Sequence, residues 1–203
     1  MCSAKNGGLL CEYMIISQIL IAKAIRSSMS TAITAVRKTV LTQHCMRIDY
    51  DSEEPSNIIG TLNMLRVQYK ADMIVGTSLG GFYAAVLSAR HDLPVMLVNP
   101  CLTPFLLSIL SDFKTRPLVK LFGELAKIDS SNVSCIVGDD DEVLGDHAFT
   151  EKLLGNSRFR RIDGGKHSGA TLPLKEFFTE MLDYYTNTLP LIDAAPSISP
   201  DIL

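Results

Sequence analysis

Ser78 lies in the pentapeptide GTSLG, with a glycine two residues to either side of it. An apolar run, Met73–Gly76, precedes the serine, and a segment with helical character, Leu79–His91, follows it. G-x-S-x-G between a strand and a helix predicts a sharp turn that lifts a nucleophilic hydroxyl above a sheet, because glycines let the backbones approach closely. The helix N-terminus would place the Leu79 amide beside the serine oxygen, where it could bind an oxyanion. The alternative is a glycine-rich turn that serves packing alone.

A serine nucleophile needs a base near neutral pH, and the chain has four histidines. His91 ends the helix that starts at the serine, about 18 Å away by helical rise. His44 ends the first predicted helix, and His147 lies within another. His167 lies in GGKHSGA, a loop after a predicted strand, at the carboxyl edge of the sheet that also carries Ser78. We therefore predict that His167 is the base, the alternative being a solvated loop histidine.

A carboxylate should orient that histidine, and GDDDEVL offers four consecutive acids directly after the predicted strand Val133–Val137. We predict Asp141, because the three residues before it make the turn and Val143 begins the next helix. Asp139 is the competitor, and a solvated loop or a cation site is the alternative for the whole run. The chain order serine, aspartate, histidine is that of α/β-hydrolases and differs from the chymotrypsin and subtilisin orders.

These residues require a scaffold of alternating strands and helices. The strand candidates are Met14–Ala22, Met46–Tyr50, Met73–Gly76, Pro94–Val98, Val133–Val137 and Arg158–Ile162. The helix candidates are Ser28–Gln43, Ser56–Tyr69, Leu79–His91, Val143–Leu154 and Leu172–Thr186. Because several strand runs are continuously apolar, we expect an α/β fold of the α/β-hydrolase type: a mainly parallel, doubly wound sheet of about six strands in a single domain, residues 1–203.

The connection 103–129 is longer than a minimal crossover and carries two apolar helical patterns separated at Pro117. It predicts a small helical lid, in which Phe105 and Leu106 would line an apolar acyl pocket; a plain pair of packing helices is the alternative. Before it, Asn99-Pro100 closes a strand, and Asn99 could hydrogen-bond loop backbone. The tail 189–203 has three prolines and is expected to be loosely ordered.

The composition excludes several classes of protein. The net charge of −3, with no long basic run, gives no attraction to nucleic acid or anionic lipid. Five scattered cysteines predict neither a zinc site nor a disulfide framework and favour the cytoplasm. The apolar segment Tyr13–Ala22 is too short to span a bilayer and is interpreted as a strand rather than a signal peptide. We expect no metal or cofactor and no membrane partner, and a monomer or homodimer acting on a small molecule.

Four segments resemble one family: GTSLGGFYA at 76–84, LPVMLVNPCLTPF at 93–105, GDDDEVL at 138–144 and GGKHSG at 164–169. Together they are similar to small bacterial esterases of the YqiA-like type, from about Ser27 to Tyr185. The resemblance implies an α/β-hydrolase fold, cleavage of small acyl esters or thioesters without a cofactor, and a catalytic triad of Ser78, Asp141 and His167.

The chain departs from that family upstream, where Lys23-Ala24-Ile25-Arg26 stands in place of a His-Gly-Phe-type turn. A backbone amide of Ala24 or Ile25 is predicted to complete the oxyanion hole with Leu79, although the missing glycine adds a Cβ to this loop. Lys23 and Arg26 are candidates to bind an anionic substrate tail, with a solvated loop as the alternative. If the oxyanion loop is damaged, the chain is a catalytically impaired α/β-hydrolase that serves as a binding module.

Overall fold

The computed structural model describes residues 19–25, 40–46, 54–106, 115–155 and 157–188. Its centre is a six-stranded sheet with the order β2-β1-β3-β4-β5-β6. The strands are β1 (Ile19–Ile25), β2 (Val40–Met46), β3 (Met73–Thr77), β4 (Val95–Val98), β5 (Val133–Gly138) and β6 (Arg158–Ile162). Strands β3 to β6 are mutually parallel, so their carboxyl ends share one edge of the sheet.

The N-terminal part of the sheet differs from the expected arrangement. β1 runs antiparallel to β3, with Ile19 opposite Gly76 and Ala22 opposite Met73, and β2 runs antiparallel to β1. The predicted helix 28–43 is wrong at its end, because residues 40–43 belong to β2, and the predicted strand 46–50 overlaps β2 at Met46 alone. The sequence VLTQHCM suits a strand through its apolar and β-branched start, which the helical pattern concealed.

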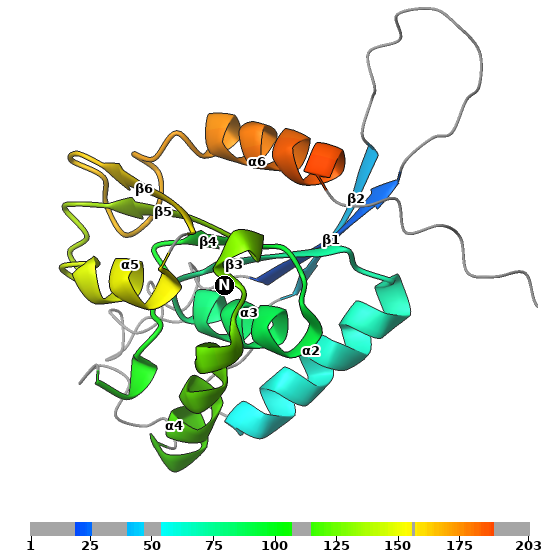
Figure 1. Cartoon of the computed structure of the whole chain (residues 1–203). Coiled ribbons are helices and arrows are strands. Elements are labelled where there is room, and N and C mark those ends of the chain that lie inside the picture. The colour runs from blue at the N-terminus through cyan, green and yellow to red at the C-terminus, as the bar shows by residue number, and fades with distance from the viewer. Residues whose placement is uncertain (1–18, 26–39, 47–53, 107–114, 156, 189–203) are drawn as a thin grey trace, which may run out of the picture.

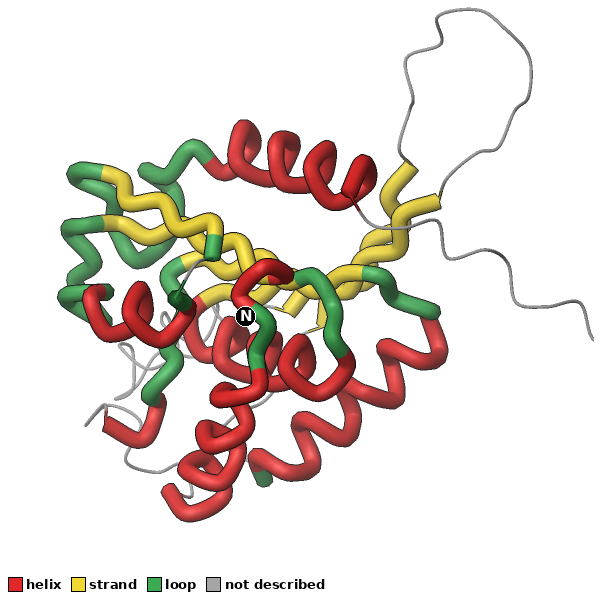
Figure 2. The backbone as a smooth tube through the Cα atoms, in the orientation of Figure 1, coloured by secondary structure: helices red, strands yellow, loops and turns green. Residues whose placement is uncertain are grey.

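Helices cover both faces of the sheet, as Figures 1 and 2 show. The helices are α2 (Pro55–Tyr69), α3 (Ser78–His91), α4 (Thr115–Glu124), α5 (Ala148–Leu154) and α6 (Leu174–Thr188). Apolar residues of α2, α3, α4 and α5 form one core with Ile74, Leu97 and Val137 of the sheet. Helix α6 packs on the other face, where Phe177 and Met181 contact a second core that includes Met96. The predicted doubly wound α/β architecture is confirmed.

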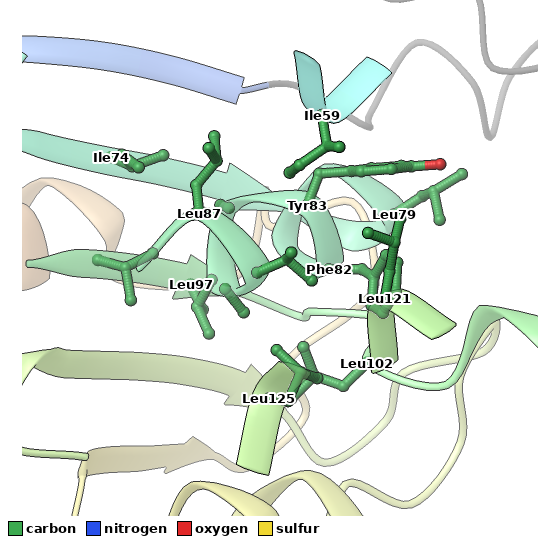
Figure 3. Packing of buried hydrophobic residues seen from close by; sticks show 14 of the residues in the cluster. Ile59, Ile74, Leu79, Phe82, Tyr83, Leu87, Leu97, Leu102, Leu121 and Leu125 are labelled. Carbon is green, nitrogen blue, oxygen red and sulfur yellow. The ribbon is translucent and has the colours of Figure 1, made fainter. Parts of the chain in front are cut away.

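Helix α3, which begins at Ser78, lies at the centre of the larger core (Figure 3). Phe82, Tyr83 and Leu87 are fully buried, in a cluster that also contains Ile59 of α2 and Leu121 of α4. Burying each large apolar side chain contributes roughly 1.5–3 kcal/mol, so this helix is firmly anchored to the sheet. The serine at its N-terminus therefore has a rigid support.

The segment predicted as a lid is described in part. A 3-10 turn, Pro104–Leu106, follows β4, and α4 begins at Thr115 with Pro117 in its first turn, where a missing N–H is tolerated. Leu118 and Leu121 of α4 are buried in the same core as α3, as in a packing helix. Residues 107–114 of the predicted lid and the tail 189–203 lie outside the described residues.

Candidate active site

The serine occupies a strained turn between β3 and α3. Ser78 has φ 49°, in the left-handed region that non-glycine residues rarely adopt. A Cβ at Gly76 would lie 2.6 Å from the Ala84 Cβ, and one at Gly81 would lie 2.7 Å from the Pro100 Cβ. Gly76, the first glycine of the G-x-S-x-G pattern, and Gly81, the residue after its second glycine, are thus required by close packing of the turn. A sharp turn from strand to helix is what the pattern predicts.

The structure brings the three predicted site residues into one hydrogen-bonded chain. The Ser78 Oγ lies 3.0 Å from the His167 Nε2. The His167 Nδ1 lies 3.0 Å and 2.9 Å from the two carboxylate oxygens of Asp141. Asp141 and His167 are 4% and 2% exposed, and Ser78 is 9% exposed, so all three residues are largely shielded from water. In this pattern the Nδ1–H donates to the carboxylate, which leaves the Nε2 free to accept the serine proton.

Asp141 accepts more hydrogen bonds than the one from His167. Its Oδ1 accepts from the backbone N–H of Val143 at 2.9 Å and of Leu144 at 2.8 Å. Burial by itself raises the pKa of Asp141. The hydrogen bonds from the side chains of two histidines, His147 and His167, and from the Leu144 N–H outweigh burial and hold that pKa well below its ordinary value. The aspartate is therefore ionised wherever the histidine could act as a base.

The competing acid, Asp139, has a different environment. Its carboxylate pairs with Arg161 of β6 at 3.1 Å, and its side chain is 41% exposed. Asp141, by contrast, is in contact with His167. Counting residues through the turn after β5 thus selected the aspartate that reaches the histidine.

Asn99, at the end of β4, ties together the loops that carry the acid and the base. Its Oδ1 accepts from the Gly138 N–H at 2.8 Å, at the start of the acid loop. Its Nδ2 donates to the carbonyl oxygens of Lys166 and His167, both at 3.0 Å. The residue is 1% exposed and has φ 41°, a conformation that asparagine tolerates better than most residues. The prediction that Asn99 bonds loop backbone is confirmed.

The acid loop and the base loop also touch each other directly, backbone against backbone. A Cβ at Gly138 would lie 2.2 Å from the carbonyl oxygen of Gly165, and one at Gly165 would lie 2.6 Å from the Gly138 Cα. The Asp140 N–H donates to that same carbonyl at 3.0 Å. The distance between Asp141 and His167 is therefore set by two loops in van der Waals contact.

Sequence reasoning missed His147. It was expected inside a helix, but α5 begins at Ala148 and His147 is its N-cap residue. The side chain is 2% exposed, and its Nε2 lies 3.0 Å from the Asp141 Oδ2. The signal in the sequence was the dipeptide Gly145-Asp146, which is typical of a turn. This turn brings His147 back toward Asp141, six residues upstream, and Asp146 accepts a hydrogen bond from the Ala148 N–H at 2.9 Å.

The predicted upstream half of the oxyanion hole is wrong in this structure. Because β1 is antiparallel to β3 and Ala22 pairs with Met73, Ala24 and Ile25 lie beyond the start of β3. By strand rise they are about 20 Å from Ser78. Lys23, which is part of β1 and pairs with Thr42, lies at the same far edge, so it is no substrate-binding residue either. Arg26 lies outside the described residues.

The remaining candidates follow β4. The Phe105 ring is partly buried, and its centroid lies 5.2 Å from that of Phe122 in α4, whereas Leu106 is 71% exposed. The Phe122 ring stacks in turn on Phe149 of α5 at 6.4 Å. These rings form an apolar surface that joins the segment after β4 to the helix that His147 caps.

A competing nucleophile beside the serine is inactive. The Cys101 N–H donates to the Ser78 carbonyl at 2.9 Å, which places this cysteine next to the turn. Burial raises the pKa of the Cys101 thiol to about 12, so it stays protonated at neutral pH. In the described part of the chain, no group of three or more His, Cys, Asp or Glu side chains is arranged to hold a metal ion. No helix among the described residues has the length and apolar character to cross a membrane.

The chain is similar to one family model and to several solved structures. Residues 27–113 match the model of the uncharacterised protein family UPF0227. A structure reported for LipS and LipT, two metagenome-derived lipolytic enzymes, is 12% identical over 69% of this chain and 76% of the other, with a TM-score of 0.52. A membrane phospholipase A described as a bacterial virulence factor is 13% identical over 75% of this chain and 72% of the other, with a TM-score of 0.49.

The sheet, the helices on its two faces and the strained serine turn define the class: the chain has the α/β-hydrolase fold. The match over residues 27–113 agrees with the resemblance to the YqiA-like group.

Proposed function

We propose that this protein is a serine hydrolase that cleaves carboxylic esters or thioesters of small to medium acyl groups. The observation that carries the proposal is the contact of 3.0 Å between the Ser78 Oγ and the His167 Nε2, at a serine held in a strained turn. A serine with φ 49° is destabilised by backbone strain, and strain of this kind is concentrated at functional sites. The aspartate behind the histidine completes the set of roles that acyl transfer requires.

The proposed reaction has two halves. In the first, His167 removes the Ser78 proton through Nε2 while the hydroxyl oxygen attacks the acyl carbon, and Asp141 stabilises the imidazolium that forms. The Leu79 N–H, at the N-terminus of α3, binds the oxyanion. The imidazolium then protonates the departing alcohol or thiol, which leaves an acyl group on the serine. In the second half, His167 activates water, and hydrolysis of this ester restores the free serine.

We base the substrate class on a row of aromatic rings. Phe105 follows β4, Phe122 lies on α4 and Phe149 on α5, and the Phe122 ring contacts the other two. An apolar surface favours an acyl chain over a charged group, because burial of hydrocarbon is the main source of affinity. No cationic residue takes part in this proposal, since Lys23 lies at the other edge of the sheet.

A fluorophosphonate probe tests the proposal directly, because it reacts only with a serine activated as a nucleophile. We expect covalent labelling of the folded wild type and none in Ser78→Ala or His167→Ala. His91→Ala is the matched control, because His91 ends the same helix at its far end, and it should be labelled like the wild type. p-Nitrophenyl acetate turnover should fall at least about 10³-fold in His167→Ala. An unlabelled, folded wild type would refute the proposal.

A catalytically impaired binding module is the second candidate, and one observation favours it. Both predicted upstream oxyanion donors, Ala24 and Ile25, lie at the wrong edge of the sheet, so only Leu79 is assigned here. Loss of one oxyanion donor costs on the order of 10²–10³ in rate. An enzyme limited in this way would still be labelled by the probe but would turn over esters slowly. A binding module would keep the fold and show neither labelling nor turnover.

A further inference from the structure

The Asp141 carboxylate is surrounded by donors on both oxygens. The Val143 and Leu144 amides bond its Oδ1, and His167 reaches both oxygens. Among the described residues, the remaining donor to the carboxylate is His147, whose Nε2 lies 3.0 Å from the Oδ2. The two amides bond the Oδ1 alone, whereas the Oδ2 is reached by both histidine rings. His147 is therefore the donor that holds the Oδ2 independently of His167.

We propose that His147 is a positioning residue of the hydrolase, which donates its Nε2–H to Asp141 and thereby sets both the orientation and the basicity of the carboxylate that faces His167. The inference rests on the proposed function, and it adds a fourth residue to the hydrogen-bonded chain from serine to aspartate. Its role is exerted through Asp141, since the described contact of the His147 side chain is with that carboxylate and not with the serine.

The burial and the backbone of His147 support this role. The side chain is 2% exposed, so its ring N–H needs a hydrogen-bond partner, and the Asp141 carboxylate lies within reach of the Nε2. The His147 carbonyl accepts from the Glu151 N–H at 3.0 Å, which fixes the residue at the start of α5. The ring therefore approaches Asp141 from a rigid helix end, on the side opposite the two loop amides.

The other charged groups near this site are engaged with partners of their own. Arg161 of β6 forms ion pairs with Asp139, Asp146 and Glu151, at 3.1, 3.7 and 3.0 Å. The pair Lys166–Asp140 lies at 3.3 Å, and the Glu142 carboxylate accepts from the His167 N–H at 3.2 Å. All of these pairs contain exposed side chains, where water screens their fields. The buried contact of His147 with Asp141 is thus the interaction best placed to act on the base.

Loss of this donor has a defined direction. A carboxylate with one hydrogen bond fewer is less stabilised, so it attracts the proton of the neighbouring imidazolium more strongly. In His147→Leu, the acid limb of the pH profile of kcat/KM should therefore move upward by about 0.5–1 pH unit. kcat should also fall on the order of tenfold, because Asp141 is less well oriented. His147→Gln keeps an N–H donor and should stay within about 0.3 pH unit of the wild type.

The decisive experiment is an NMR titration of the His167 ring in the wild type, His147→Leu, His147→Phe and His147→Gln, alongside kcat/KM profiles with p-nitrophenyl acetate. His91→Gln is the control for removal of a histidine outside the site. His147→Phe retains the ring volume, so it replaces His147→Leu if that variant unfolds on circular dichroism. An upward shift in the Leu and Phe variants that is absent in Gln supports the proposal.

Two results would overturn it. The His167 titration could be the same in His147→Leu, His147→Phe and the wild type, or His147→Gln could shift as much as they do. A drop in kcat without a shift shows a merely structural role. An inactive and unlabelled wild type would refute the proposed hydrolase. The NMR titration needs no turnover, so it would still test the effect of His147 on Asp141 and His167.

Discussion

Replacing Asn99 with alanine is the sharpest probe of how this site is assembled. Asn99 contributes no group to the proposed chemistry, yet its amide bonds the acid loop at Gly138 and the base loop at Lys166 and His167. Alanine removes all three hydrogen bonds and leaves the three backbone groups without this partner. It must also adopt φ 41°, which an alanine reaches only with strain.

The cost of Asn99→Ala can be worked from these contacts. The three hydrogen bonds, two buried and one partly buried, contribute about 1 kcal/mol each, and the left-handed conformation adds about 1 kcal/mol for a residue with a Cβ. We expect the free energy of unfolding to fall by about 4 kcal/mol, a large share of the roughly 5–15 kcal/mol typical of a domain. Asn99→Gly loses the same hydrogen bonds without the strain, so it should be about 1 kcal/mol more stable than Asn99→Ala.

Urea unfolding, followed by circular dichroism, measures both variants against the wild type. Asn63→Ala is the control, because Asn63 lies on α2 and its side-chain oxygen accepts from a neighbouring side chain, Arg66, at 3.1 Å. It should change stability by no more than about 0.5 kcal/mol. Esterase turnover of Asn99→Ala should fall as well, since the two loops lose their common anchor. A loss of unfolding free energy below about 1 kcal/mol would show that the hydrogen bonds of Asn99 do not hold the two loops together. Equal losses in Asn99→Ala and Asn99→Gly would contradict the strain argument.

Three further predictions follow from the site. Ser78→Gly should raise the melting temperature, by relief of about 1 kcal/mol of strain at φ 49°, while probe labelling is abolished; an unchanged melting temperature contradicts the strain argument. Gly138→Ala should cost more than about 3 kcal/mol in urea unfolding, because its Cβ would lie 2.2 Å from the Gly165 carbonyl oxygen, whereas Gly123→Ala, with no atom within 4 Å, should be neutral or stabilising. The depressed pKa of Asp141 contributes stability that is complete above the unfolded-state pKa of about 3.9 and is lost as pH falls below it. Unfolding free energy should therefore decline more steeply from pH 5 to pH 2 in the wild type than in Asp141→Asn, and parallel curves would contradict this.

The sequence alone predicted the part of the fold that local pattern determines. Strands β3 to β6 and the helices α2, α3 and α6 lie within about two residues of the expected bounds, because apolar runs and amphipathic periods define them. The direction of β1 could not be predicted in this way. An apolar run such as ILIAKAI pairs equally well in either direction, and only the partner strand and the connecting chain decide between them. The oxyanion donors Ala24 and Ile25 were misplaced for that reason, and because β1 continues to Ile25 where a loop was expected after Ala22.

The serine, the acid and the base could be predicted from the sequence for a different reason. Each follows a strand of a parallel sheet, so all three meet at one edge. The role of His147 could not be predicted in this way, because its side chain reaches Asp141 through a reverse turn at Gly145, which has φ 68°, and not from a strand end. The apolar pattern from Val143 onward suggested a continuous helix and concealed that turn. The Gly145 N–H bonds the Asp141 carbonyl at 2.9 Å, so the turn depends on a contact that periodicity does not report.

The described side-chain hydrogen bonds of Ser78, Asp141 and His167 share one property: all of them join residues between Ser78 and His167, whereas β1 meets this part of the chain through its pairing with β3. We expect the antiparallel pair of β1 and β2 to open more readily than the parallel strands, because none of these side-chain hydrogen bonds depends on it. In hydrogen exchange, the amides of β1 and β2 would then exchange by local opening, and those of β3, β4 and β5 by global unfolding. The protein would behave as two cooperative units, with all of the chemistry in one of them.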